Sequence, residues 1–84
     1  MEGICERCGT YSNVEIHHIY GGRGRREVSD RYGAVIALCP KCHRYLHDNP
    51  AKMLPWKQVW QQKLMLDNDW TTEDFIRVFG RNYI

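Results

Sequence analysis

The chain has 84 residues, of which 43% are hydrophobic, and carries a formal net charge of +2 at pH 7. This length corresponds to one domain, 1–84, whose hydrophobic core alone gives marginal stability, so a structural metal is an expected supplement. The sequence has neither the roughly 20 consecutive apolar residues of a membrane span nor the basic start and apolar run of a secretory signal, which predicts a cytoplasmic protein.

Short strands and turns are predicted in the first part of the chain. Residues 5–9 are typical of a zinc knuckle, because glycine after the second cysteine lets the backbone turn beneath a metal. The β-branched and aromatic residues of 14–20 predict a strand, and the apolar run 34–38 predicts a second, buried strand. Between them, 21–26 contain three glycines and are predicted to form a loop.

The last part of the chain, 50–84, is predicted to be a helical extension that packs on the core formed by 1–49. A first helix should follow Pro55, with a face on helical spacing that packs on the domain; this pattern comprises Trp56, Val59, Trp60, Lys63 and Leu64. Thr71 and Asp74 predict a capping box at the start of a second helix, which Gly80 ends.

Four cysteines occur as two CxxC pairs separated by 30 residues: Cys5, Cys8, Cys39 and Cys42. Without a secretory signal a reducing compartment is expected, where thiolates bind metals more often than they form disulfides. Two such pairs can supply four thiolates to a tetrahedral structural zinc.

Two other interpretations of these cysteines fit less well. A two-cysteine, two-histidine finger would leave Cys39 and Cys42 unused, and its pairs would be much further apart than the roughly 12 residues of such fingers. Residues 39–43 also match the CxxCH attachment motif for haem, but that interpretation leaves the first CxxC pair without a role and requires export.

A helix predicted from Pro40 to Asp48, favoured by proline in its first turn, carries two of the four histidines. His43 and His47 are four residues apart, so both rings share one helical face and can reach a single cation. His17 and His18 are adjacent on the preceding strand and face opposite sides, so one can complete a metal site while the other faces elsewhere. Three histidines leave a cation open to water and a phosphate oxygen, and the fourth is a candidate general base.

The segment from Tyr20 to His47 is basic, with six arginines and lysines against two acidic residues. Such a segment beside the histidines favours contact with phosphates, although an ordinary solvated surface also explains it. Arginine suits bidentate phosphate contacts. By charge and proximity, the expected nucleic-acid contacts are Arg23, Arg25, Arg26 and Arg44.

The order of these motifs resembles the zinc-containing HNH, or ββα-metal, endonucleases. The resemblance is carried by Cys5-Glu-Arg-Cys8, His17-His18-Ile19 and Leu38-Cys-Pro-Lys-Cys-His-Arg-Tyr-Leu-His47. Residues 79–84 are similar to the end of small HNH-like proteins of bacteriophages, which implies a phage or mobile-element origin in a bacterial host. The implied fold is small α+β: a ββα-metal, treble-clef-like core with structural zinc, followed by two C-terminal helices.

The resemblance also implies a role for each histidine. His18 would be the general base that activates a water for attack on the scissile phosphorus, and His17, His43 and His47 would hold a catalytic divalent cation, Mg²⁺, Mn²⁺, Ni²⁺ or Zn²⁺. The products would carry a 5′ phosphate and a 3′ hydroxyl. The implied substrate is double-stranded DNA, and a double-strand cut by one small site implies a homodimer or successive nicks.

One position departs from the family pattern. The asparagine of the HNH name should fall nine residues before the first helix histidine, where this chain has Ala34. In the family this asparagine braces the loop and strand that carry the general base. The candidates to replace it are Asp30, Ser29 and Asn13, and the sequence does not choose among them.

The resemblance therefore predicts a metal-dependent DNA endonuclease. Ala34 motivates an alternative, a catalytically silent treble-clef zinc module that binds nucleic acid or a protein partner. A third interpretation is a phage protein whose target is a host or terminase protein.

Overall fold

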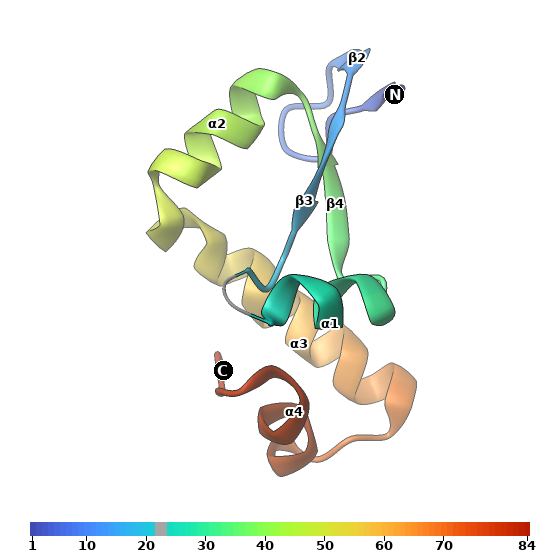
Figure 1. The fold of residues 1–84 in the computed structure, drawn as a ribbon, viewed down its shortest axis with the longest axis vertical. Helices are drawn as coiled ribbons and strands as arrows, with labels where there is room; N and C mark the ends of the chain where they lie inside the picture. Colours follow the sequence, from blue (N-terminus) through green and yellow to red (C-terminus); the bar gives the residue numbers. More distant parts are fainter. Residues whose placement is uncertain (22–23) are drawn as a thin grey trace.

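Two short antiparallel sheets and four α-helices make up a small α+β protein in the computed structural model, which describes residues 1–21 and 24–84 (Figure 1). The strands are β1 (Glu2–Ile4), β2 (Tyr11–Asn13), β3 (Glu15–His18) and β4 (Val35–Leu38). The helices are α1 (Arg25–Arg31), α2 (Pro40–Asp48), α3 (Leu54–Asn68) and α4 (Thr72–Phe79), with a short 3-10 helix, η1 (Pro50–Met53), before α3. None of the helices in the described ranges is long and apolar enough to cross a membrane.

The β3–β4 pair carries the adjacent histidines His17 and His18 at the end of β3. The two strands are antiparallel, with His17 opposite Ile36 and His18 opposite Val35. Alternate residues of β4, Ile36 and Leu38, are buried, as expected for a strand with one face on the core. The strand predicted over 34–38 is thus confirmed, whereas the one predicted over 14–20 is shorter and comprises β3 alone.

Helix α2 has the predicted bounds, because its capping residues act locally. The Cys39 sulfur accepts a hydrogen bond from the Cys42 N–H at 3.4 Å, and Pro40 occupies the first turn. At the other end, the Asn49 N–H bonds to the Tyr45 carbonyl at 3.0 Å. Helix α2 therefore begins at the second CxxC pair and carries His43 and His47 after it.

The helical extension packs on the rest of the chain through an aromatic cluster. The fully buried ring of Tyr20, just after β3, lies 4.5 Å from Phe79, 5.7 Å from Phe75 and 5.4 Å from Tyr83, measured between ring centroids. These contacts join the end of β3 to α4 and the C-terminus.

The start and end of α4 follow the sequence prediction. Thr71 and Asp74 form the predicted capping box, with the Asp74 N–H donating to the Thr71 hydroxyl at 3.2 Å and the Thr71 N–H donating to the Asp74 carboxylate at 3.0 Å. Hydrogen bonds from the Thr71 backbone and side chain hold the pKa of Asp74 below its usual value. Gly80 ends the helix with a φ of +91°.

Two sequence predictions about helices are wrong. The segment 21–26 is not all loop, because α1 begins at Arg25; Gly22 and Arg23 lie outside the described residues. On α3, Val59 was expected on the packed face but is 64% exposed, while the polar Gln61 is fully buried. The spacing pattern missed Gln61 because that side chain is buried through hydrogen bonds to the C-terminal residues and not through apolar contact.

Candidate metal centres and the histidine cleft

Four cysteine side chains meet where the turn between β1 and β2 approaches the start of α2. The sulfur atoms of Cys5, Cys8, Cys39 and Cys42 all lie within 4.8 Å of one another, and three of the four residues are buried. The turn is closed by Gly9, whose N–H bonds to the Cys5 carbonyl at 2.8 Å and whose φ is +78°. Four thiols at this spacing fit a tetrahedral zinc. Within 1–21 and 24–84, they are the one group of three or more potential ligands that lies so close together.

The thiols differ in acidity before a metal binds. Burial acts to raise the pKa of Cys5, but hydrogen bonds from the backbone of Cys39, Cys8 and Arg7 outweigh it and lower that pKa to about 6. The Arg7 guanidinium, 3.4 Å from the Cys42 sulfur, acts to lower the pKa of Cys42, but burial and the other three thiols raise it to about 11. Because zinc binds thiolates, its binding would release the proton that Cys42 otherwise keeps.

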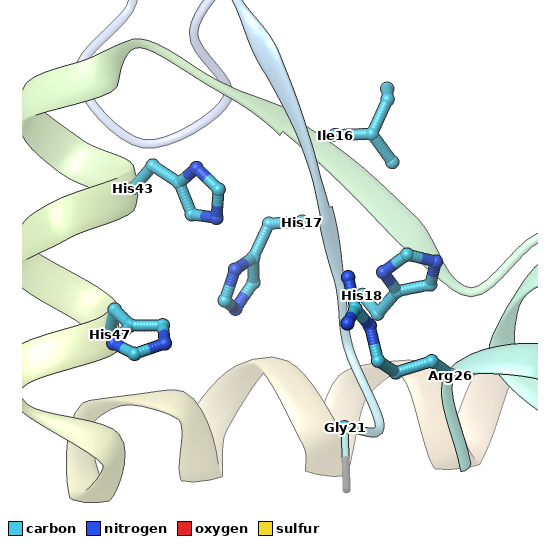
Figure 2. A pocket seen from close by; sticks show the side chains of 7 residues that line it. All are labelled: Ile16, His17, His18, Gly21, Arg26, His43 and His47. Carbon is cyan, nitrogen blue, oxygen red and sulfur yellow. The ribbon is translucent and has the colours of Figure 1, made fainter. Parts of the chain in front are cut away.

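The four histidines line a cleft of about 650 Å³ beside β3. His43 and His47 extend from α2 toward β3, and His17 extends from β3 toward α2 (Figure 2). The His17 and His43 rings meet edge to face, with centroids 5.1 Å apart. His18 projects from the other side of β3, as strand alternation predicts, and still lines the cleft (Figure 2). All four histidines therefore lie at one site.

Two of the histidines have surroundings that suit metal binding. His43 Nδ1 lies 2.8 Å from Oε1 of Glu15, so a ring that donates its Nδ1–H to this carboxylate leaves Nε2 open to the cleft. Burial lowers the pKa of His17, and the charges of the other three histidines and of Lys57 lower it further. A neutral imidazole is the form that binds a cation.

His18 has a carboxylate partner of its own. Its Nε2 lies 2.8 Å from Oδ1 of Asp30 on α1, and its side chain is only 17% exposed. In the tautomer that donates Nε2–H to Asp30, Nδ1 carries the free lone pair of the ring. Asn13 lies elsewhere, because its Oδ1 accepts a hydrogen bond from the N-terminal ammonium at 2.7 Å. Of the candidates to replace the family asparagine, Asp30 is the one that contacts the His18 ring.

A hydrogen-bonded brace fixes the two residues that follow His18. The buried Ser29 hydroxyl accepts from the Tyr20 N–H at 3.1 Å and donates to the Tyr20 carbonyl at 3.0 Å. The Ala34 N–H donates to the Ser29 carbonyl at 2.8 Å, and the Ala34 carbonyl accepts from the Ile19 N–H at 3.0 Å. The end of β3 is thus tied to α1 by a serine hydroxyl and by main-chain bonds through Ala34.

The predicted phosphate-contacting arginines lie in different places. Arg26 lines the histidine cleft (Figure 2), and Arg44 lines an adjoining hollow with the two histidines of α2. The half-buried Arg25 packs against Gly80 at the end of α4, where its guanidinium fills the space that a Cβ would need. Arg23 lies outside the described residues.

The chain is similar to the Type IV methyl-directed restriction enzyme EcoKMcrA of Escherichia coli (strain K12). The two are 39% identical over 56 aligned residues, which cover 55% of this chain and 19% of the relative. The chain therefore spans less than a fifth of that relative's length. No family model matches the chain, and no solved structure matches it. The four cysteines remain a candidate metal site whatever the similarity implies.

Glu15 is a site residue that the sequence analysis missed, although the sequence holds a signal for it. Residues two apart on a strand share a face, so Glu15 must face the same side as His17, toward α2. A carboxylate on that side meets a histidine of the facing helix. The predicted strand 14–20 would have been sufficient to place it there.

Proposed function

We propose that the chain is a metal-dependent DNA endonuclease of the HNH, or ββα-metal, type, and that 1–84 forms one domain of this kind. The proposal depends on one observation above all: four histidines line one cleft beside α2, the helix that also carries two cysteines of the metal cluster. The partial similarity to a restriction enzyme supports the same class of reaction. DNA is accordingly the proposed substrate, in a bacterial cytoplasm.

His18 is the proposed general base. With Nε2 held by Asp30, its Nδ1 would take the proton from a water that attacks the scissile phosphorus, and the products would carry a 5′ phosphate and a 3′ hydroxyl. His17, His43 and His47 would hold a divalent cation, with Glu15 orienting the His43 ring. When bound, this cation supplies charge stabilisation to the phosphate and to the leaving 3′ oxygen.

Ala34 is compatible with this proposal because the chain has another brace. In HNH endonucleases, which this chain resembles, an asparagine fixes the segment that carries the general base. Here the Ser29 hydroxyl and the Ala34 main chain bond to the two residues after His18. Asp30 adds a direct contact to the ring. We propose that the two functions of the asparagine, bracing and orientation, are divided between Ser29 and Asp30.

A plasmid-nicking assay tests the proposal. Zinc-loaded protein with Mg²⁺, Mn²⁺, Ni²⁺ or Zn²⁺ should convert supercoiled DNA to nicked or linear DNA, and His18→Ala should lower the rate by about 10²–10⁴-fold, the usual contribution of a general base. Asp30→Asn should lower it by a smaller factor. Asn13→Ala is the matched control, since its side chain bonds to the N-terminal ammonium, and it should cleave like the wild type. No cleavage with any of the four cations would contradict the proposal.

A catalytically silent zinc module is the second candidate function. It is favoured by Ala34 and by the absence, among the described histidines, of a group as closely spaced as the cysteines. Metal analysis by mass spectrometry separates the two candidates. One tightly held zinc per chain indicates the silent module, and a second, exchangeable cation that His43→Ala removes indicates the nuclease.

A further inference from the structure

A pair of cations lies on the helical extension, outside the histidine cleft. Lys57 of α3 and Arg81 after α4 both lie over the ring of Tyr83, with Lys57 Nζ 5.3 Å and Arg81 Cζ 5.2 Å from the ring centroid. All three residues line a hollow of about 250 Å³. Two like charges that share one ring repel each other, and an anion bound between them would remove that repulsion.

No carboxylate among the described residues forms an ion pair with Lys57 or Arg81. The ion pairs within 1–21 and 24–84 join His18 to Asp30, His43 to Glu15, Lys63 to Asp67 and Arg77 to Asp74. Lys57 is half-buried, and its pKa is lowered by burial and further by the charge of Arg81. The hollow therefore has an unbalanced positive charge that is partly withdrawn from water.

Amide side chains of α3 hold the C-terminal wall of this hollow in place. Gln61, which is fully buried, accepts from the Tyr83 N–H at 2.8 Å and donates to Oδ1 of Asn82 at 2.7 Å. Gln58 donates to the Tyr83 carbonyl at 2.9 Å. These bonds hold the last residues of the chain against α3, so a ligand would meet a preformed site and would pay less entropy to order it.

The hollow is connected to the proposed active site through Tyr20. The Tyr20 hydroxyl donates to the Lys57 carbonyl at 2.7 Å, and its ring lies 5.4 Å from the Tyr83 ring. Tyr20 is two residues beyond His18, and the first turns of α3 pass below the space between α2 and β3 (Figures 1 and 2). The cation pair is thus linked, through Tyr20, to the segment that follows the two histidines of β3.

We propose that Lys57, Arg81 and Tyr83 form a binding site for a backbone phosphate of the DNA strand whose scissile phosphate occupies the histidine cleft. The helical extension would then position the strand, in addition to packing on the core. This inference rests on the proposed nuclease function. It adds a contact outside the segment 5–47, which carries the CxxC and histidine motifs.

Salt-dependent DNA binding tests the site without requiring cleavage. A labelled duplex is titrated with zinc-loaded His18→Ala protein at several NaCl concentrations, and anisotropy gives the binding constant. Adding Lys57→Gln and Arg81→Gln should reduce the slope of log K against log salt by about 0.9, the value for one lost phosphate contact. Adding Lys63→Gln and Arg77→Gln removes the same charge from cations already paired with Asp67 and Asp74, and should leave the slope unchanged.

Further variants and controls make the result decisive. Arg81→Lys and Lys57→Arg keep both charges and should retain the slope, and thermal melting checks that each variant is folded. Equal slopes for the two glutamine pairs would overturn the phosphate site even if plasmid cleavage is observed. A slope reduced only by Lys57→Gln and Arg81→Gln supports the site even if no cation activates cleavage, so the two proposals can fail separately.

Discussion

Carboxylates contact two of the four histidines, and each contact selects one ring nitrogen. The Glu15 carboxylate is hydrogen-bonded to Nδ1 of His43, and the Asp30 carboxylate is hydrogen-bonded to Nε2 of His18. The sequence predicts the histidines because their spacing on a helix and a strand is local. The sequence does not single out Asp30 from the three candidates to replace the asparagine. The contact of Asp30 with His18 depends on where α1 begins, and the glycines before α1 predict a loop there instead.

Glu15→Gln should weaken binding of the catalytic cation. The amide still reaches His43 but carries no charge to make the imidazole more basic, and loss of such an outer-shell partner typically costs 10–100-fold in metal affinity or activity. We expect the Mn²⁺ concentration for half-maximal plasmid cleavage to rise by about that factor, with a smaller change in rate at saturating Mn²⁺. Glu2→Gln is the matched control, because Glu2 lies on β1 and contacts Tyr11 instead of a histidine. An unchanged Mn²⁺ requirement for Glu15→Gln would contradict a role in orienting His43.

At the scale of elements, capped helices were predicted best. The bounds of α2 and the start and end of α4 follow from Pro40, the capping box and Gly80, all of which act within a turn of the helix. In contrast, β1 and β2 have three residues each, and α1 has seven and follows an N-cap glycine, Gly24, which provides no side-chain cap. Such short elements depend on tertiary contacts that local patterns do not contain.

Gly80→Ala tests the junction between α4 and α1. The φ of +91° disfavours any Cβ, which costs roughly 1–2 kcal/mol, and the Arg25 guanidinium must also move. Gly33→Ala is the matched control, because its φ of +69° carries the same kind of strain with open space around the new Cβ. We expect Gly80→Ala to lower the melting temperature more than Gly33→Ala, and the difference to shrink in an Arg25→Ala background. Equal losses in both backgrounds would show that Arg25 does not hold this junction.

At the scale of the whole molecule, two candidate centres share one helix. The cysteine cluster joins the β1–β2 turn to the start of α2, and Glu6 strengthens the junction by bonding its N–H to the Ala37 carbonyl at 2.8 Å and its carboxylate to the Ala37 N–H at 2.6 Å. His43 comes directly after Cys42 and His47 follows about one turn later, so the same helix extends both histidines toward β3 (Figure 2). The spacing of the cysteines was sufficient to predict that they lie together. The attachment of the C-terminal residues to α3 could not be predicted, because it depends on a hydrogen bond between Gln61 and Asn82, which are far apart in the sequence.

Zinc removal should therefore unfold the chain and, with it, the histidine cleft. A domain of this size has a stability of only a few kcal/mol, whereas a structural zinc contributes roughly 10 kcal/mol or more in small zinc domains. Circular dichroism after chelation should show loss of helix, and added Zn²⁺, but not Mg²⁺, should restore it because thiolates prefer the softer cation. Cys42→Ser should behave like the chelated protein, while His43→Ala should retain zinc and fold normally. A chelated chain that keeps its helical signal and melting temperature would show that the hydrophobic core alone maintains the fold, and that the cysteines serve some other purpose.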